Sequence, residues 1–399
     1  MAQYLDKCTL FEREKSHPHK PIILIFLYSQ MKSIHTYILL TGFLLSILGF
    51  KAKAQNDPKH DFMLAAQGHY GYIISHRNNM GHLVRGHIRG LEVYYSFRTD
   101  GSKTWQQLYK YPEMGVSFMH FDLANPDQLG TLECLYPFID FKLNKLKRKN
   151  RLNLRVGVGM AYLTHPFDIK TNHKNNAIGS HLNGFVNMRL NYATMLTRSL
   201  RMDFGVGLSH ASNGATNTPN LGLNMASTNL GFAYLIGNKE INYKKDSVPP
   251  GCKKSWNPSI IAVWGIKELE PPTGPKYMAF GLMVNVYKTL NHKNRIGGGV
   301  EMAYNNATKQ VWEDDGVTDP AFADIVQAGV KVGYEFRIHR LSLPIDFGYY
   351  VFKKQAYNGN MFHRIGMRYM VSKHIIANVT LLTHWAKADY FEWGLGYQF

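Results

Sequence analysis

The last eleven residues of the chain, 389–399, read DYFEWGLGYQF and decide how the rest of the sequence is interpreted. Apolar side chains recur there at every second position, and Glu, Gly and Gln stand between them. Successive side chains of a β-strand point to opposite faces, so this period of two predicts a strand with one apolar and one polar face. The residues that share the apolar face are Phe391, Trp393, Leu395, Tyr397 and Phe399.

The same period of two recurs in segments of about ten residues along the chain. Residues 89–98, RGLEVYYSFR, alternate in this way, and glycines gather on the polar face of 154–163, LRVGVGMAYL, and of 295–304, RIGGGVEMAY. Strands that cross a lipid bilayer as part of a barrel need this length and carry aromatic residues near their ends. Glycine relieves crowding inside a curved sheet. These features favour a barrel over a soluble β-sandwich.

The C-terminal strand strengthens that prediction. Its alternation and its terminal Phe399 resemble the closing strand of bacterial outer-membrane barrels, which the barrel assembly machinery recognises. Between residues 55 and 399 no run approaches the roughly 18 apolar residues of a spanning helix, which excludes helical membrane proteins. We therefore expect an all-β fold, a transmembrane antiparallel outer-membrane β-barrel.

Alternation and turn signals predict two sets of strands. The first set lies at about 61–236 and the second at 257–399, with a polar, proline-rich linker at 237–256 between them. A closing-strand signature is present only at residue 399, which favours one barrel of about 12–16 strands. The alternative is an eight-stranded barrel followed by a second β half. The expected strands are 66–76, 88–98, 113–122, 131–143, 151–163, 180–195, 200–212, 223–236, 257–266, 277–288, 295–304, 322–337, 341–353, 361–371, 374–384 and 389–399.

The N-terminal region predicts export. Residues 31–54 combine a basic start at Lys32, an apolar run to Phe50 and small residues before Gln55, as a secretory signal peptide does. We expect translation to start at Met31, so that residues 1–30 are an extension outside the native protein. The mature chain is then 55–399.

Charge and cysteines narrow the classes of partner. Residues 55–399 hold 39 basic and 25 acidic residues, a net charge of about +14. This surface suits lipopolysaccharide phosphates and acidic outer-membrane lipids, or it reflects a generally basic protein with no specific anion. Nucleic acid is not an expected partner of an exported chain without a recognition module. We expect Cys134 and Cys252 to be unpaired, and no metal site or cofactor, because no residues have metal-ligand spacing.

Polar residues interrupt the apolar face of one strand. Across 200–212, strict alternation puts His210 and Ser212 on the same face as the apolar residues before them, and this face must point outward in a barrel. In the next strand the same parity places Asn224 outward. A periplasmic N-terminus would put all three near the extracellular rim, at the level of the outer leaflet. A serine beside a histidine suggests acyl transfer, with His as general base and a third polar group orienting the imidazole.

These residues resemble the PagL-type lipid A 3-O-deacylases, known more broadly as acyloxyacyl hydrolases, in a long version with about twice the usual number of strands. The family motif His-x-Ser-Asn, followed by Pro-Asn-x-Gly-x-Glu, matches here from His210 to Asn213 and from Pro219 to Gly222. The resemblance implies Ser212 as nucleophile, His210 as base, and Asn213 with the nearby backbone amides, that of Gly214 among them, as oxyanion donors. It also implies an outer-membrane hydrolase with lipopolysaccharide, or lipid A, as partner.

One residue departs from this family pattern. Asn224 stands where the family has its acidic residue. The amide can still hold a histidine tautomer, but it cannot stabilise the imidazolium by charge. Asn224 is therefore the third member expected at the site.

Other interpretations stay open at this point. The barrel could be a non-catalytic porin or a binding barrel, and the sequence leaves a homodimer undecided. A second cluster near the C-terminus places His384 and Glu392 toward the lumen, where a stabilising pair is expected, while Lys387 and Asp389 are expected to form a solvated turn pair.

Overall fold

The computed structural model describes residues 62–144, 150–237, 243–244, 251–355, 358–385 and 387–399. The expected signal peptide at 31–54 and the expected extension at 1–30 lie outside these described residues. No helix in the described part of the chain is long and apolar enough to cross a membrane.

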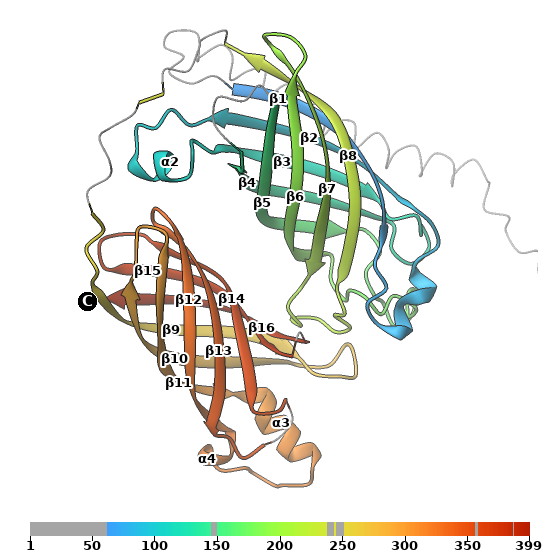
Figure 1. The fold of residues 1–399 in the computed structure, drawn as a ribbon. Helices are drawn as coiled ribbons and strands as arrows, with labels where there is room; N and C mark the ends of the chain where they lie inside the picture. Colours follow the sequence, from blue (N-terminus) through green and yellow to red (C-terminus); the bar gives the residue numbers. More distant parts are fainter. Residues whose placement is uncertain (1–61, 145–149, 238–242, 245–250, 356–357, 386) are drawn as a thin grey trace, which may run out of the picture. The chain divides into compact units, whose positions relative to one another are not determined.

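The described chain forms two closed antiparallel β-barrels of eight strands each (Figure 1). The first barrel, blue to yellow-green in Figure 1, closes by pairing β1 with β8 over twelve residue pairs, from Phe62–Ile236 to Ile73–Met225. Its strands are β1 Phe62–Ile73, β2 Ile88–Arg98, β3 Glu113–Asp122, β4 Thr131–Lys142, β5 Asn150–Leu163, β6 Leu182–Met195, β7 Leu200–Ser212 and β8 Leu223–Ile236.

The second barrel, yellow to red in Figure 1, closes by pairing β16 with β9. Its strands are β9 Trp256–Glu268, β10 Lys276–Thr289, β11 Asn294–Asn305, β12 Val326–Ile338, β13 Leu341–Phe352, β14 Met361–Met370, β15 Ile375–His384 and β16 Lys387–Gln398. Short helices lie in the connections: η1 Asn78–Leu83, α2 Thr104–Leu108, α3 Asn306–Asp314 and α4 Phe322–Ile325.

The antiparallel outer-membrane-type barrel fold predicted from the sequence is confirmed, but the number of barrels corrects the favoured expectation. The chain does not form one barrel of 12–16 strands; it forms the alternative, an eight-stranded barrel followed by a second β half that is itself closed. Alternation fixes which face of a strand is apolar, but closure depends on which strands pair, and β1 and β8 are more than a hundred residues apart. The strand that closes the first barrel, β8, is not at the C-terminus and does not need the terminal pattern found at 389–399.

The lumen of the first barrel is filled by charged side chains. Glu92 is fully buried and accepts hydrogen bonds from Arg189 at 2.5 and 3.0 Å, from Arg155 at 3.3 Å and from the Ser117 hydroxyl at 2.6 Å. Eight strands leave an interior that side chains can just fill. This lumen is therefore a packed polar core, in contrast to the wide water-filled channel of a porin.

Connections cover one end of the first barrel, which we call the β7–β8 rim because the loop 213–222 lies there. The loops 74–87, 123–130 and 164–181 share this end. Met80, Leu83 and Leu129 from these loops have no exposed area and pack into the hydrophobic cluster of the barrel end. The rim is thereby sealed by apolar side chains.

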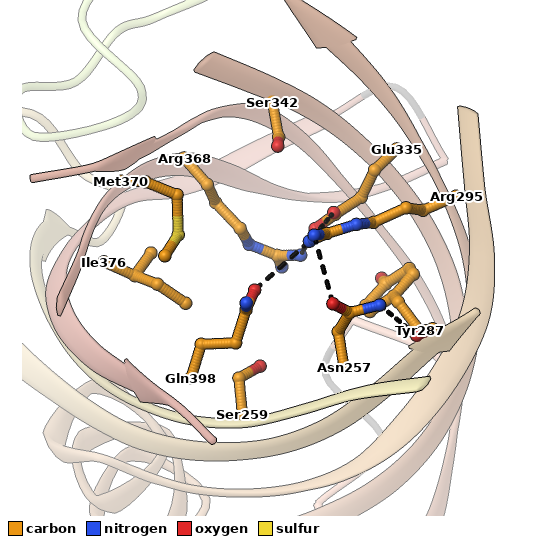
Figure 2. A pocket seen from close by; sticks show the side chains of 10 residues that line it. All are labelled: Asn257, Ser259, Tyr287, Arg295, Glu335, Ser342, Arg368, Met370, Ile376 and Gln398. Atoms are coloured by element: carbon orange, nitrogen blue, oxygen red, sulfur yellow. Dashed lines mark hydrogen bonds and ion pairs between the residues drawn. The ribbon is translucent and has the colours of Figure 1, made fainter. Parts of the chain in front are cut away.

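The second barrel also has a charged lumen. Arg364 donates to Glu392 at 2.5 and 2.8 Å and to Glu301 at 2.8 and 3.2 Å, and Lys331 lies 3.1 Å from Asp346. The lumen contains a cavity of about 20 Å³, which has room for roughly one water molecule. Figure 2 shows its lining: Asn257, Ser259, Tyr287, Arg295, Glu335, Ser342, Arg368, Met370, Ile376 and Gln398.

The second polar cluster predicted from the sequence differs in its pairing. His384 and Glu392 are both buried on the lumen side, yet Glu392 pairs with Arg364, and the Nδ1 of His384 lies 3.6 Å from Asp389. Asp389 is also not a solvated partner of Lys387, because it is buried and forms an ion pair with Lys267. Asp389 is the third residue of β16, and its side chain lies inside the barrel.

Candidate active site

The outward face of β7 changes from apolar to polar at its end. Phe204, Val206 and Leu208 are each about half exposed, at 49%, 56% and 47%, as expected for side chains on the outer surface of the barrel. The next two residues of the same parity are His210 and Ser212. Ser209 and Ala211, which have the opposite parity, are buried toward the lumen.

His210 lies directly opposite Asn224 in the β7–β8 pairing. The Nδ1 atom of His210 and the Oδ1 atom of Asn224 are 2.6 Å apart. Because an amide oxygen only accepts hydrogen bonds, Nδ1 carries the proton and Nε2 keeps its lone pair. Within the described part of the chain, the Nε2 atom of His210 has no hydrogen-bond partner. This is the tautomer that a general base on this face requires.

Ser212 ends β7 and is 6% exposed. Its hydroxyl oxygen lies 3.3 Å from Oδ1 and 3.2 Å from Nδ2 of Asn220, and it accepts a hydrogen bond from the backbone N–H of Gly214 at 3.2 Å. No hydrogen bond joins Ser212 to His210 in the described structure. The hydrogen bond between nucleophile and base is often long in the absence of substrate.

Two glycines shape the loop after Ser212. Gly214 has φ +62°, which L side chains seldom adopt, and this turn aims its N–H at the Ser212 hydroxyl. Gly222 has φ +79°, and a Cβ there would lie 2.8 Å from Cε1 of His210. The imidazole therefore packs over the backbone at Gly222, and a side chain at this position would displace it.

The two oxyanion donors expected from the sequence have different surroundings. The N–H of Gly214 faces the Ser212 hydroxyl, whereas the backbone N–H of Asn213 donates to Asn220 at 3.1 Å and its side chain donates to Ser180 at 2.8 Å. Asn213 thus ties the loop to the neighbouring strand connection. The side chain that contacts the Ser212 hydroxyl is that of Asn220. Asn220 belongs to the sequence motif, but the sequence analysis assigned it no role.

His76 is a second residue that sequence reasoning missed. It follows β1, and its Nδ1 lies 3.0 Å from the Asn224 amide nitrogen, while its Nε2 lies 3.1 Å from the Leu221 carbonyl oxygen. The two histidines thus flank Asn224. No signal in the sequence joins His76 to Asn224, because the closure of β1 on β8 brings them together.

The loop 164–181 supports the 213–222 loop. Ile178 forms a β-bridge with Asn220, and the N–H of Gly222 donates to the Ala177 carbonyl at 2.9 Å. Asp168 organises the tip of this loop, where hydrogen bonds from Thr171, chiefly from its backbone N–H, lower the pKa of the Asp168 carboxyl. The loop behind Asn220 is therefore held by backbone contacts.

The arrangement has the groups that nucleophilic chemistry on an ester uses. No group of three or more His, Cys, Asp or Glu side chains in the described residues could hold a metal ion. Cys134 and Cys252 are unpaired. A hydroxyl, an imidazole with a free Nε2 and an N–H beside the hydroxyl are the groups that acyl transfer from an ester requires.

Two family models match the chain, one over each barrel. The model described as lipid A 3-O-deacylase (PagL) matches residues 89–233, and the one described as acyloxyacyl hydrolase, C-terminal domain, matches residues 255–399. The first match contains the whole of β7 and β8 as far as residue 233. None of the curated proteins compared with the chain matches it.

Solved structures similar to the chain include outer-membrane barrels. A mutant of the Rhodopseudomonas blastica porin has 9% sequence identity, covers 85% of this chain and 100% of its own, and has a TM-score of 0.16. The Acinetobacter baumannii outer membrane protein Omp33 has 10% identity, covers 85% of this chain and 98% of its own, and also has a TM-score of 0.16. TM-scores this low carry no information about what the chain does.

Proposed function

Because the chain belongs to the lipid A 3-O-deacylase (PagL) family of outer-membrane β-barrels, we propose that it removes the 3-O-linked hydroxyacyl chain of lipid A. The proposal places the reaction on the outer surface of the first barrel, at the β7–β8 rim. The main support is the hydrogen bond of 2.6 Å from His210 to Asn224, which leaves Nε2 of His210 able to act as a base. His210 is two residues before Ser212 on the same face of β7.

Ser212 is the nucleophile in this proposal. Its hydroxyl oxygen attacks the carbonyl carbon of the ester while Nε2 of His210 takes the hydroxyl proton. The tetrahedral intermediate then collapses, the bond to the sugar 3-oxygen breaks, and His210 returns the proton to that oxygen. Water, deprotonated by His210, hydrolyses the acyl-serine and releases the hydroxy fatty acid.

The negative oxygen of the intermediate needs donors that are already in place. In the resting structure the Gly214 N–H and the Asn220 amide nitrogen both lie 3.2 Å from the Ser212 oxygen. When the serine becomes bonded to the acyl carbon, these donors lie beside the new oxyanion. We assign them this role, together with the Asn213 amide if its contact with Asn220 opens.

A substrate in the membrane reaches an outward site by lateral diffusion. The half-exposed apolar row of Phe204, Val206 and Leu208 leads directly to His210 and would contact the acyl chains. With a periplasmic N-terminus, the β7–β8 rim lies in the outer leaflet, where lipopolysaccharide resides. Export by a signal peptide at 31–54 and insertion by the barrel assembly machinery belong to the same proposal.

Mass spectrometry of lipopolysaccharide incubated with the folded protein in detergent tests the proposal. We expect lipid A to lose one hydroxyacyl mass with the wild type and to stay intact with Ser212→Ala. The matched control is Ser209→Ala, because Ser209 lies on the same strand but faces the lumen, where it accepts a hydrogen bond from Asn187. This control should remain active.

Two results would overturn the proposal. Intact lipid A from several sources with the wild-type protein would favour the alternative, a non-catalytic porin or binding barrel, and ion conductance in planar bilayers would then separate those two. Equal loss of activity in Ser212→Ala and Ser209→Ala would show that the strand tolerates no change and that the serine has no special role.

A further inference from the structure

We infer that His76 is a positioning residue that fixes the orientation of the Asn224 amide and thereby the tautomer of His210. The inference rests on the proposed function, because the tautomer matters only if His210 acts as a base. It explains how an asparagine can stand where the family has an acidic residue.

An amide at this position has an ambiguity that a carboxylate lacks. Both oxygens of a carboxylate accept a hydrogen bond, so either one can hold the Nδ1–H of His210. An amide has one accepting and one donating end. If its NH2 faced His210, the imidazole would have to carry its proton on Nε2, and the lone pair needed to take the Ser212 proton would be lost.

The contact of His76 with the Leu221 carbonyl removes this ambiguity. Its Nε2 lies 3.1 Å from the Leu221 carbonyl oxygen, which can only accept, so Nε2 carries the proton. Its Nδ1 therefore has a lone pair and accepts from the Asn224 amide nitrogen at 3.0 Å. The Ile74 carbonyl, 3.4 Å from Nδ1, is not a hydrogen-bond partner in this tautomer.

The three hydrogen bonds then run in one direction, from His210 through Asn224 to His76 and the Leu221 carbonyl. His76 donates to the Leu221 carbonyl, Asn224 donates to His76, and His210 donates to Asn224 at 2.6 Å. At the His210 end of this series of hydrogen bonds, the Nε2 lone pair is left free to take a proton. A flipped Asn224 amide would put its oxygen against the His76 lone pair and its NH2 against Nδ1–H of His210, which costs both hydrogen bonds.

The backbone holds His76 at this distance. The N–H of Ile74 donates to the Asn224 carbonyl at 2.8 Å and continues the β1–β8 ladder past the last residue of β1. His76 is two residues further along the chain, and Leu221 lies in the loop that leads into β8. His76 therefore contacts the loop and the strand that frame the site.

A double-mutant cycle tests the inference. We expect His76→Ala to lower kcat about tenfold to thirtyfold in the natural background, with KM unchanged, because most of the molecules then hold the wrong tautomer. In the Asn224→Glu background, the same change should lower kcat less than threefold, since a carboxylate needs no orientation. Equal losses in both backgrounds would overturn the inference.

Two further variants separate positioning from folding. His76→Asn should recover most of the activity, because its side-chain oxygen can accept from Asn224 where Nδ1 does. His82→Ala is the matched control: His82 is another exposed histidine of the same loop, bonded to the Lys174 carbonyl at 2.7 Å, and its loss should leave kcat unchanged. A loss in His82→Ala as large as in His76→Ala would indicate a general effect on the loop.

A spectroscopic measurement keeps this inference distinct from the proposed function. Nitrogen NMR of histidine-labelled protein in detergent should show His210 protonated on Nδ1 in the wild type and as a mixture of tautomers in His76→Ala. If this change occurs in a protein without deacylase activity, the proposed function fails and the positioning stands. If Ser212-dependent deacylation occurs but the tautomer is the same in both proteins, the positioning role of His76 fails alone.

Discussion

The two barrels differ most clearly where their last strand pairs reach the connecting turn. In the first barrel, His210 and Ser212 end β7 on the outward face. In the second, β15 ends with His384, which is 7% exposed and lies 3.6 Å from Asp389 inside the lumen. Neighbouring residues of a strand point to opposite faces. A shift of a histidine by one position along the strand would therefore move it from the outer surface to the lumen, or the reverse.

The lumens, by contrast, are built alike. Glu92 in the first barrel and Glu301 in the second each accept hydrogen bonds from buried arginines, Arg189 at 2.5 Å and Arg364 at 2.8 Å respectively. Charged networks inside the barrels therefore do not distinguish the two halves. Lumen charges are thus common to both barrels, whereas His210 and Ser212 lie on the outward face of the half that we propose to be catalytic.

Replacing the two histidines should give the largest difference between the barrels. We expect His210→Ala to lower kcat/KM for lipid A deacylation about 10³-fold, because the general base is lost. His384→Ala should leave kcat/KM within about twofold of the wild type. Initial rates measured by mass spectrometry check both values, and a comparable loss in His384→Ala would show that the two histidines do not differ in their importance for activity.

Removing one lumen carboxylate should affect only its own barrel. Glu92→Gln leaves the buried Arg189 without a charge partner, although Arg155 keeps its contact with Asp140. The change should lower the unfolding free energy of the first barrel by about 3 kcal/mol. Five of the six tryptophans lie in residues 255–399, so tryptophan fluorescence reports mainly on the second barrel and circular dichroism on both.

Urea unfolding distinguishes the barrels on this basis. In Glu92→Gln we expect part of the circular dichroism transition to move to lower urea while the fluorescence midpoint stays fixed. Glu301→Gln should lower the fluorescence midpoint by a smaller amount, because Arg364 keeps Glu392 and Lys331 keeps Asp346 as partners. A joint shift of both signals in either variant would show that the barrels unfold as one unit.

Asn224→Glu adds a negative charge to the outward site of the first barrel. A carboxylate beside Nδ1 of His210 stabilises the imidazolium that forms in the transition state, and we expect kcat to rise about tenfold. The measurement is the deacylation rate at saturating lipopolysaccharide. An unchanged or lower rate would mean that imidazolium formation does not limit turnover.

Separating the halves should have the smallest effect. The first barrel closes on itself, so residues 55–244 expressed alone should deacylate lipid A with a kcat within about threefold of the full chain. Residues 255–399 alone should be inactive. Activity that needs both halves would show that the second barrel contributes to the reaction.

Much of the fold could be predicted because strand faces are local information. The strand expected at 200–212 is β7, Leu200–Ser212, and the one expected at 223–236 is β8, Leu223–Ile236. The number of barrels could not be predicted in this way. Closure depends on pairing between distant strands, and no short stretch of sequence states which strand is the partner of β1.

Some residues of the candidate site could be predicted from the sequence, whereas others come together only in the folded structure. His210, Ser212 and Asn224 could be grouped by parity alone, because β7 and β8 are joined by one short loop. Asn220 lies in that loop, but only its conformation turns the amide to the serine. His76 is 148 residues from Asn224 in the chain and meets it only through barrel closure.

The outward direction of Ser212 also determines how concentration acts on the proposed reaction. A site on the outer surface of a barrel samples substrate from a two-dimensional film, so its turnover depends on the mole fraction of lipid A in that film. In mixed micelles, added inert detergent should then slow the enzyme even when the amounts of enzyme and lipopolysaccharide are constant. This surface dilution would be absent for a serine that faced the lumen, as Ser209 does.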